Sequence, residues 1–265
     1  MYRSYLFVPA SRPERIAKAR EAGAGAVIVD LEDAVAPQDK ASARAALDAH
    51  LDPGRPVFVR TNAVDTPWFG DDLALCAAPG VAGVLLPKAE SASALDEVAR
   101  RIGEAKAIVP IVETAVGFDN ARALAACGRT QRLAFGSIDF QVDLGIDGEG
   151  EELLYFRSQL VLVSRLAGLQ PPIDGVTVAI DDAQALRADT LRGRRLGFGA
   201  KLCIHPRQVA VVNACFAPTP EEVAWARRVL DAAAASQGSA VAVDGKMVDV
   251  PVIRKAENII AAAAI

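Results

Sequence analysis

Apolar and polar residues alternate in two distinct ways along residues 5–204. Short, nearly continuous apolar runs have the pattern of fully buried strands, and the longer segments between them space their apolar residues three or four apart, as amphipathic helices do. The predicted strands are 5–9, 26–31, 56–62, 83–88, 107–113, 132–136, 174–178 and 200–204. The helices predicted between them include 14–22, 40–50, 94–105 and 153–169.

Strands that alternate with helices predict parallel pairing, and eight such units close into a (β/α)₈ barrel. An open, doubly wound sheet is the competing architecture. That fold more often begins with a Gly-rich phosphate turn, and the chain contains neither G-x-G-x-x-G nor G-x-x-x-x-G-K-[ST]. The pattern therefore favours the α/β barrel, whose active site lies at the C-terminal ends of its strands.

The pattern changes after residue 204. Helices are predicted at 206–216 and from Thr219 to 235, and Pro220 and Glu222 complete a capping box at the start of the second. A flexible break at 236–239 precedes a hairpin, 240–243 and 247–250, and a last helix, 251–260. We divide the chain into a barrel, 1–216, and a helix-hairpin-helix extension, 217–265. This extension is too small to hold a core alone, so we expect it to pack on the barrel or on a neighbouring subunit.

Polar residues follow most of the predicted strands. They are Asp30, Glu32, Asp33, Arg60, Asn62, Lys88, Glu113, Asp139 and His205. Single members have simple structural explanations, because Lys88 can be a solvated strand end and His205, before Pro206, can cap a helix. The joint pattern favours a functional site, since strand ends converge at one face of a barrel.

Glu113 and Asp139 each close a short apolar run. A charge at the end of an apolar strand is costly to bury unless something pairs with it. Two carboxylates on neighbouring strand ends would form a hard, all-oxygen site suited to Mg²⁺. With these two residues alone, the alternative that both are solvated loop residues or helix N-caps is equally good.

The 265 residues are 52% hydrophobic and 23% charged, with a formal net charge of −4. The absence of a long basic run argues against nucleic acid or an anionic membrane as a partner. No apolar segment approaches the roughly 20 residues of a membrane span, and we expect a cytoplasmic protein. The sequence contains only two histidines, which argues against a His-rich metal site and against a Ser-His-Asp triad. The four cysteines show no C-x-x-C spacing and are expected to be buried thiols.

Eight motifs occur in order along the chain. They are Leu6-Phe7-Val8-Pro9, Arg12-Pro13-Glu14-Arg15, Asp30-Leu31-Glu32-Asp33-Ala34-Val35, Val59-Arg60-Thr61-Asn62, Leu86-Pro87-Lys88, Val112-Glu113-Thr114, Gly136-Ser137-Ile138-Asp139-Phe140 and Ile204-His205-Pro206. Together they resemble the citrate lyase beta-subunit-like family of the pyruvate-type aldolases, and the pattern is most similar to malyl-CoA and citramalyl-CoA lyases. The specific part of the resemblance is the Asp-Leu-Glu-Asp element combined with the two metal carboxylates.

The resemblance implies a Mg²⁺-dependent carbon–carbon lyase that cleaves a 3-hydroxyacyl-CoA of citramalyl or malyl type to acetyl-CoA and a 2-oxo acid. Glu113 and Asp139 match the metal ligands. Arg60 matches the arginine that holds the substrate oxygen, and its guanidinium fork is expected to face a carboxylate or enolate oxygen. The resemblance also implies coenzyme A contacts, at Phe7, Arg12 and Lys18.

Other positions have supporting roles in this interpretation. Glu32 and Asp33 are expected to orient Arg60 or a metal-bound water, and the remaining substrate positions are Gly136 and Ser137. Residues 245–249 resemble a C-terminal segment that delivers an acid/base aspartate, here Asp249, into the site of a neighbouring subunit. The resemblance therefore implies a homo-oligomer, a trimer, with acyl-CoA as a small-molecule partner.

Several alternatives stay open at this point. Asp249, two residues before Pro251, is also a natural helix N-cap. The chain could be a citryl-carrier-protein lyase, that is, a citrate lyase beta subunit, or a metal-dependent aldolase acting on free hydroxy acids. From a different class, it could be a non-enzymatic binding barrel. The identity of the thioester, the stereochemistry and the direction of reaction (cleavage, condensation or hydrolysis) are not fixed by the sequence.

Overall fold

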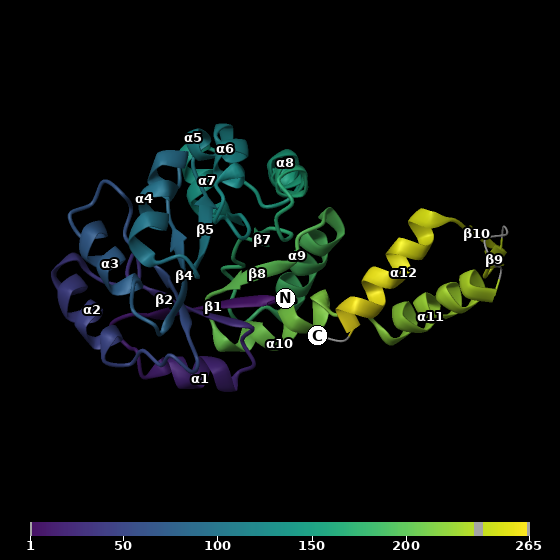
Figure 1. Cartoon of the computed structure of the whole chain (residues 1–265), viewed down its shortest axis with the longest axis horizontal. Helices are drawn as coiled ribbons and strands as arrows, with labels where there is room; N and C mark the ends of the chain where they lie inside the picture. The colour runs from purple at the N-terminus through teal and green to yellow at the C-terminus, as the bar shows by residue number, and fades with distance from the viewer. Residues whose placement is uncertain (1, 236–240, 264–265) are drawn as a thin grey trace. The chain divides into compact units, whose positions relative to one another are not determined.

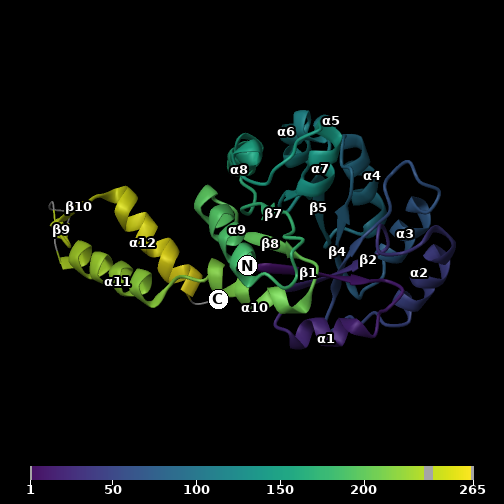
Figure 2. The same cartoon turned by 180° about the vertical axis from the view of Figure 1, so that it is seen from behind.

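In the computed structural model, strands β1 to β8 close into a parallel barrel in their sequence order (Figures 1 and 2). The structure describes residues 2–235 and 241–263. The barrel strands are β1 (Ser4–Pro9), β2 (Ala26–Asp30), β3 (Val57–Arg60), β4 (Val81–Leu86), β5 (Ala107–Val112), β6 (Ala134–Phe135), β7 (Ile173–Asp174) and β8 (Ala200–Cys203). The predicted α/β barrel is confirmed.

Helices surround the strands on the outside of the barrel (Figure 1). Parallel strands need crossover connections, which all of these helices but the last supply. They are α1 (Arg15–Glu21), α2 (Lys40–Asp48), α3 (Phe69–Cys76), α4 (Ala92–Ile102), α5 (Ala115–Asp119), α6 (Ala121–Ala126), α7 (Ser137–Leu144), α8 (Leu154–Leu166), α9 (Ala183–Leu196) and α10 (Pro206–Phe216), with short 3₁₀ helices at Pro37–Asp39 and Glu151–Leu153. Among all the helices within residues 2–235 and 241–263, none has both the length and the apolar character needed to cross a bilayer.

The interior of the barrel is filled by side chains from its strands. They are Tyr5, Ala26, Ile28, Phe58, Leu85, Val109, Ile111, Ala134, Ile173, Ala200 and Leu202, and each is at most 6% exposed. Complete burial of one such Ile or Leu side chain contributes about 1.5–3 kcal/mol to folding. Because apolar residues fill the centre, the polar residues that follow the strands are left at the C-terminal mouth.

The two shortest strands, β6 and β7, contain two residues each, and β7 overlaps its predicted range, 174–178, only at Asp174. The chain turns from β6 directly into α7, which begins at Ser137. β7 ends where the Asp174 carboxylate accepts the N–H of Gly175 at 2.9 Å. The prediction that Asp139 ends a strand is wrong: Asp139 lies in the first turn of α7, where the helix dipole favours a negative charge.

The C-terminal segment contains α11 (Pro220–Ala235), β9 (Val241–Val243), β10 (Lys246–Val248) and α12 (Val250–Ala263). The predicted capping box is present: the Glu222 N–H donates to Thr219 Oγ1 at 3.2 Å, and the Thr219 N–H donates to Glu222 Oε2 at 2.8 Å. The predicted hairpin turn is present as well, with φ of 51° at Asp244 and 74° at Gly245. The predicted flexible break at 236–239, and residue 240 of the predicted hairpin, lie outside the described residues.

The chain divides into two compact units, with residues 2–213 in the barrel unit and the C-terminal unit beginning at residue 214. The sequence analysis set this boundary after residue 216. The C-terminal unit encloses a small apolar cluster around Ala226, Val229, Val248 and Ala256, each at most 8% exposed. The expectation that this segment holds no core of its own was therefore too strong. Its packing on a neighbouring subunit stays a prediction.

Candidate active site

The end of β3 carries Arg60, whose guanidinium is surrounded by carboxylates from the last residue of β2 and from the turn that follows it. Its Nε and Nη2 donate to the two oxygens of Asp30, each at 2.7 Å. Its Nη1 lies 3.0 Å from Glu32 Oε2 and 3.3 Å from Asp33 Oδ2. Burial alone would lower the pKa of Arg60, but these carboxylates raise it, so the guanidinium stays charged.

The two-nitrogen fork of Arg60 engages the carboxylate of Asp30, and Arg60 also lines the cavity that contains Glu113 and Asp139. Its contact with a substrate or enolate oxygen stays a prediction. The side chain is 12% exposed, and the guanidinium lies over the ring of Phe7 with 4.9 Å between the central carbon and the ring centroid. Arg60 therefore offers a fixed positive charge at the barrel mouth.

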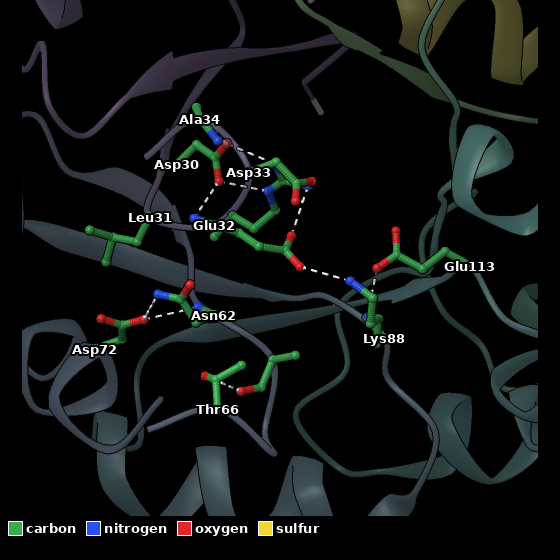
Figure 3. Close-up of polar contacts among 12 residues, drawn as sticks. Asp30, Leu31, Glu32, Asp33, Ala34, Asn62, Thr66, Asp72, Lys88 and Glu113 are labelled. Carbon is green, nitrogen blue, oxygen red and sulfur yellow. Dashed lines mark hydrogen bonds and ion pairs between the residues drawn. The ribbon is translucent and has the colours of Figure 1, made fainter. Parts of the chain in front are cut away.

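The turn after β2 is closed by hydrogen bonds to its own backbone (Figure 3). Asp30 accepts the N–H groups of Glu32 at 2.9 Å and of Ala34 at 3.1 Å. The ammonium of Lys40, which is 5% exposed, donates to the carbonyls of Leu31 at 2.6 Å and Glu32 at 2.7 Å. The Asp-Leu-Glu-Asp element is thus held rigidly, so that its carboxylates reach Arg60 at fixed distances.

Glu113 follows β5 and is 3% exposed. Its Oε1 accepts the N–H of Lys88 at 2.7 Å, and the ammonium of Lys88 lies 3.1 Å from Glu32 Oε1 (Figure 3). Burial, first, and then the charges of Glu32 and Asp139 raise the pKa of Glu113 to about 8, although the Lys88 N–H and Arg60 lower it. The carboxylates of this region therefore repel one another, and a divalent cation would relieve that repulsion.

Glu113 and Asp139 line one cavity of about 400 Å³, to which Asp30, Asp33 and Arg60 also contribute. We call it the acidic cavity. Its apolar lining includes Phe7, Ile111, Phe135, Val176 and Leu202. Of the predicted substrate positions, Gly136 and Ser137 line it too. Ser137 is 1% exposed, and its Oγ donates to Glu149 Oε1 at 3.4 Å.

The donor set of the acidic cavity fits Mg²⁺, which prefers oxygen ligands and often binds to one or two protein carboxylates. Two such groups, Glu113 and Asp139, interact electrostatically here. Within residues 2–235 and 241–263, no three His, Cys, Asp or Glu side chains gather closely enough to hold a metal ion by themselves. A bound Mg²⁺ would therefore need further oxygen atoms from substrate or water.

A second cavity of about 400 Å³ lies between β1, α1 and the end of β8, and we call it the basic cavity. It is lined by Arg15, Lys18 and His205, among others. Two of the predicted coenzyme A contacts, Phe7 and Lys18, line it. The third does not: the exposed Arg12 side chain forms an ion pair with Glu14 at 2.7 Å, away from this lining.

His205 and Asp249 both act as helix caps. The Arg207 N–H donates to His205 Nδ1 at 3.2 Å, at the start of α10. The Val252 N–H donates to Asp249 Oδ1 at 3.1 Å, at the start of α12. The N-cap interpretation of Asp249 is therefore correct within this chain, and its catalytic role stays a prediction.

Sequence reasoning assigned no role to two lysines of the site. Lys40 shares the buried face of α2 with Ala43 and Leu47, and a cation at helical spacing among apolar residues is a signal for a buried partner. Lys88 was placed at a strand end without a role. Its backbone φ of 45° and its two carboxylate partners give it one, which the sequence does not reveal.

Comparisons with known proteins identify the family to which the sequence is similar. Residues 3–206 match the profile of the family described as HpcH/HpaI aldolase/citrate lyase. A citrate lyase subunit beta-like protein of Deinococcus radiodurans is 40% identical over 276 residues, which cover 98% of this chain and 96% of the relative. A (3S)-malyl-CoA thioesterase of Cereibacter sphaeroides is 36% identical over 258 residues, covering 94% of this chain and 90% of the relative.

A solved structure is also similar over the whole chain. The crystal structure of protein CitE from Mycobacterium tuberculosis, in complex with magnesium, acetoacetate and coenzyme A, matches with a TM-score of 0.86 at 38% identity. The match covers 100% of this chain and 98% of that chain.

Proposed function

The chain belongs to the HpcH/HpaI aldolase/citrate lyase family, and from that premise we propose that it is a Mg²⁺-dependent carbon–carbon lyase. It cleaves a 3-hydroxyacyl-CoA of malyl or citramalyl type to acetyl-CoA and a 2-oxo acid. The observation that carries this proposal is a shared wall: Phe7, Pro9 and Ile204 line both the acidic and the basic cavity. A 3-hydroxyacyl-CoA of this type has a small hydroxy-acid end and a large phosphorylated coenzyme A end. Two adjoining cavities of opposite charge suit these two ends.

In this proposal the basic cavity receives coenzyme A. Arg15 and Lys18 carry positive charge on the exposed side of α1, where phosphate groups can reach them without being buried. Phe7 offers an apolar surface between the two cavities. The similar CitE structure contains coenzyme A, which supports the same class of ligand here.

The acidic cavity receives the hydroxy-acid end. Glu113 and Asp139 would hold Mg²⁺. The carboxylate of the buried Glu113 is held in place by the hydrogen bond that it accepts from the Lys88 N–H. When bound, Mg²⁺ supplies a Lewis acid for the oxygen that becomes the carbonyl of the 2-oxo acid. Val176 and Leu202 belong to the apolar lining of this cavity and limit the water in it.

Cleavage moves one proton off the substrate and one proton onto it. The hydroxyl loses its proton, the bond between the hydroxyl-bearing carbon and the thioester α-carbon breaks, and its electron pair passes into the thioester enolate. Arg60 stabilises negative charge on the enolate oxygen, because Asp30 and Glu32 hold the guanidinium in place before the reaction. We assign both transfers to Asp249 of a neighbouring subunit in a homotrimer: its carboxylate takes the hydroxyl proton and then gives it to the α-carbon of the enolate, which yields acetyl-CoA.

A second candidate reaction is thioester hydrolysis, which is favoured by the 36% identity to a (3S)-malyl-CoA thioesterase. It uses the same two cavities but releases free coenzyme A and a hydroxy acid. An aldolase acting on free hydroxy acids is disfavoured, because it has no use for the basic cavity. A citryl-carrier-protein lyase stays an alternative, since a citrate lyase subunit beta aligns with 97% of this chain, the segment that carries Asp249 included.

The test is a product analysis with malyl-, methylmalyl- and citramalyl-CoA, with and without Mg²⁺, and with free malate and citramalate as controls. We expect acetyl-CoA (or propionyl-CoA from methylmalyl-CoA) plus a 2-oxo acid, formed only with Mg²⁺. Glu113→Ala should abolish both turnover and calorimetric Mg²⁺ binding. Free coenzyme A without an oxo acid would establish hydrolysis instead, and turnover of the free acids alone would overturn the proposal.

A further inference from the structure

Lys88 links the two acidic groups on which the site depends. Its backbone N–H donates to Glu113 Oε1 at 2.7 Å, and its ammonium donates to Glu32 Oε1 at 3.1 Å (Figure 3). The other oxygen of Glu32 lies 3.0 Å from Arg60. A single residue thus connects a candidate metal ligand with the carboxylate that contacts the arginine.

The backbone of Lys88 is strained. Among the non-glycine residues that the structure describes in the barrel, only Lys88 has a positive φ, 45°. This conformation aims two consecutive amides at β5 and the residue after it: the Lys88 N–H reaches the side chain of Glu113, and the Ala89 N–H reaches the carbonyl of Ile111 at 3.3 Å. A glycine would adopt it without the steric cost of a Cβ, so the conformation alone does not explain a lysine.

The ammonium of Lys88 does not line the acidic cavity. It belongs to a separate cavity of about 500 Å³, which we call the loop cavity, together with Glu32, Lys40 and Trp68. The Glu32 side chain is 10% exposed and lies between Lys88 and Arg60. Lys88 therefore acts on the acidic cavity through its two carboxylate partners.

We propose that Lys88 is a positioning residue of the site. Its N–H fixes the Glu113 carboxylate, and its ammonium holds Glu32 against Arg60. The positive charge of the same ammonium opposes the binding of a cation in the acidic cavity. This inference rests on the proposed function. The two parts of the residue have opposite consequences, since the N–H favours metal binding by orienting a ligand and the ammonium disfavours it by charge repulsion.

Variants at position 88 separate these parts. Lys88→Met removes the ammonium and keeps the N–H, and Lys88→Gly does the same while also removing the strain. Lys88→Arg keeps the charge. The control is Arg100→Met on the outer helix α4, which removes the same charge at an exposed position that lines none of the three cavities.

We expect Lys88→Met and Lys88→Gly to bind Mg²⁺ about threefold more tightly or better by calorimetry, because a nearby positive charge is gone. Their kcat should nevertheless fall about tenfold or more, with KM for the thioester changed less than about twofold, because Glu32 no longer holds Arg60 in place. Lys88→Arg should restore the wild-type Mg²⁺ affinity and most of kcat. The metal-free Lys88→Gly protein should melt at or above the wild-type temperature.

Wild-type kcat in Lys88→Met, or weaker Mg²⁺ binding in that variant, would overturn the inference. The same effects in Arg100→Met would overturn it as well, because they would reflect net charge rather than position. If the wild-type protein cleaves no thioester, the proposed function fails. The Mg²⁺ affinities and the melting temperatures of the metal-free variants still decide the role of Lys88 in that case.

Discussion

Gly136 and Glu113 approach each other so closely that a Cβ at position 136 would lie 2.5 Å from the Cβ of Glu113. The Gly136 N–H donates to the carbonyl of Val112 at 3.0 Å, which keeps the two backbones at the spacing of a sheet. With φ of −87° and ψ of 71°, Gly136 lies outside the left-handed region that favours glycine. Glycine is needed here because the Glu113 side chain occupies the space of any Cβ.

We therefore predict that Gly136→Ala displaces the Glu113 carboxylate. Mg²⁺ binding should weaken about tenfold or more by calorimetry, while the circular dichroism spectrum stays that of a folded barrel. Gly128→Ala is the matched control, because a Cβ at position 128 meets no atom within 4 Å. Unchanged Mg²⁺ affinity in Gly136→Ala would show that Glu113 does not bind the metal in this position.

Arg60→Lys should lower activity by about 10²-fold, in line with the loss of one preorganised donor to a developing oxyanion. Lysine keeps the charge but cannot bind both oxygens of Asp30 at once, so the cation loses its fixed position. Steady-state kinetics would show the loss, and circular dichroism would verify that the variant keeps the folded barrel. A variant with wild-type turnover would mean that Arg60 only fills the mouth of the barrel.

The stability of the metal-free protein should depend on pH through Glu113. Its pKa is raised to about 8, above the ordinary value of 4.5, so the folded state holds the proton more tightly than the unfolded state. The stabilising contribution is complete below pH 4.5 and is lost as the pH rises through 8. Between these limits, the free energy of unfolding should fall by at most about 1.4 kcal/mol per pH unit.

Urea unfolding in EDTA from pH 5.5 to 8.5 measures this effect, with Glu113→Gln as the comparison because glutamine does not titrate. The wild-type curve should descend relative to that of Glu113→Gln. Parallel curves would mean that Glu113 is ionised throughout this pH range.

Asp249→Ala tests the proposed contribution of the C-terminal unit. Metal and coenzyme A binding should be retained, and carbon–carbon cleavage should fall about 10²-fold or more. Loss of the N-cap alone costs about 1 kcal/mol of stability and leaves the chemistry intact. Asp249→Asn is therefore the informative partner, since it keeps the cap and removes the acid.

Mixed oligomers decide whether Asp249 acts across subunits. Co-expression of Asp249→Ala and Glu113→Ala chains should restore partial activity, because some sites would combine an intact barrel with an intact C-terminal unit. If mass spectrometry verifies the mixed oligomers and turnover stays absent, Asp249 acts within its own chain or serves only as a helix cap.

The barrel could be predicted from the sequence because strands buried on both faces, such as β2 and β5, have nearly continuous apolar sequences. β6 and β7 could not be delimited in this way. The end of β6 depends on a helix that begins at once after Gly136, and the end of β7 on a hydrogen bond that the Gly175 N–H donates to the Asp174 carboxylate.

The site was predictable in part for a similar reason. Strand ends identify the polar residues at the mouth, but not which of them meet. Asp30 and Arg60 meet because β2 and β3 pair with these two residues in register, and sequence patterns do not fix register between parallel strands. Likewise, the left-handed backbone of Lys88 depends on its contacts with Glu113 and β5, which no local pattern encodes.

The wall between the acidic and basic cavities also limits how the substrate range can be changed. Phe7, Pro9 and Ile204 line both cavities, so a substitution at any of them alters the carrier end and the acid end together. Val176 and Leu202 line only the acidic one of the two. A designer who wants a longer acyl chain without weaker coenzyme A binding should therefore begin at Val176 and Leu202, and leave the shared wall intact.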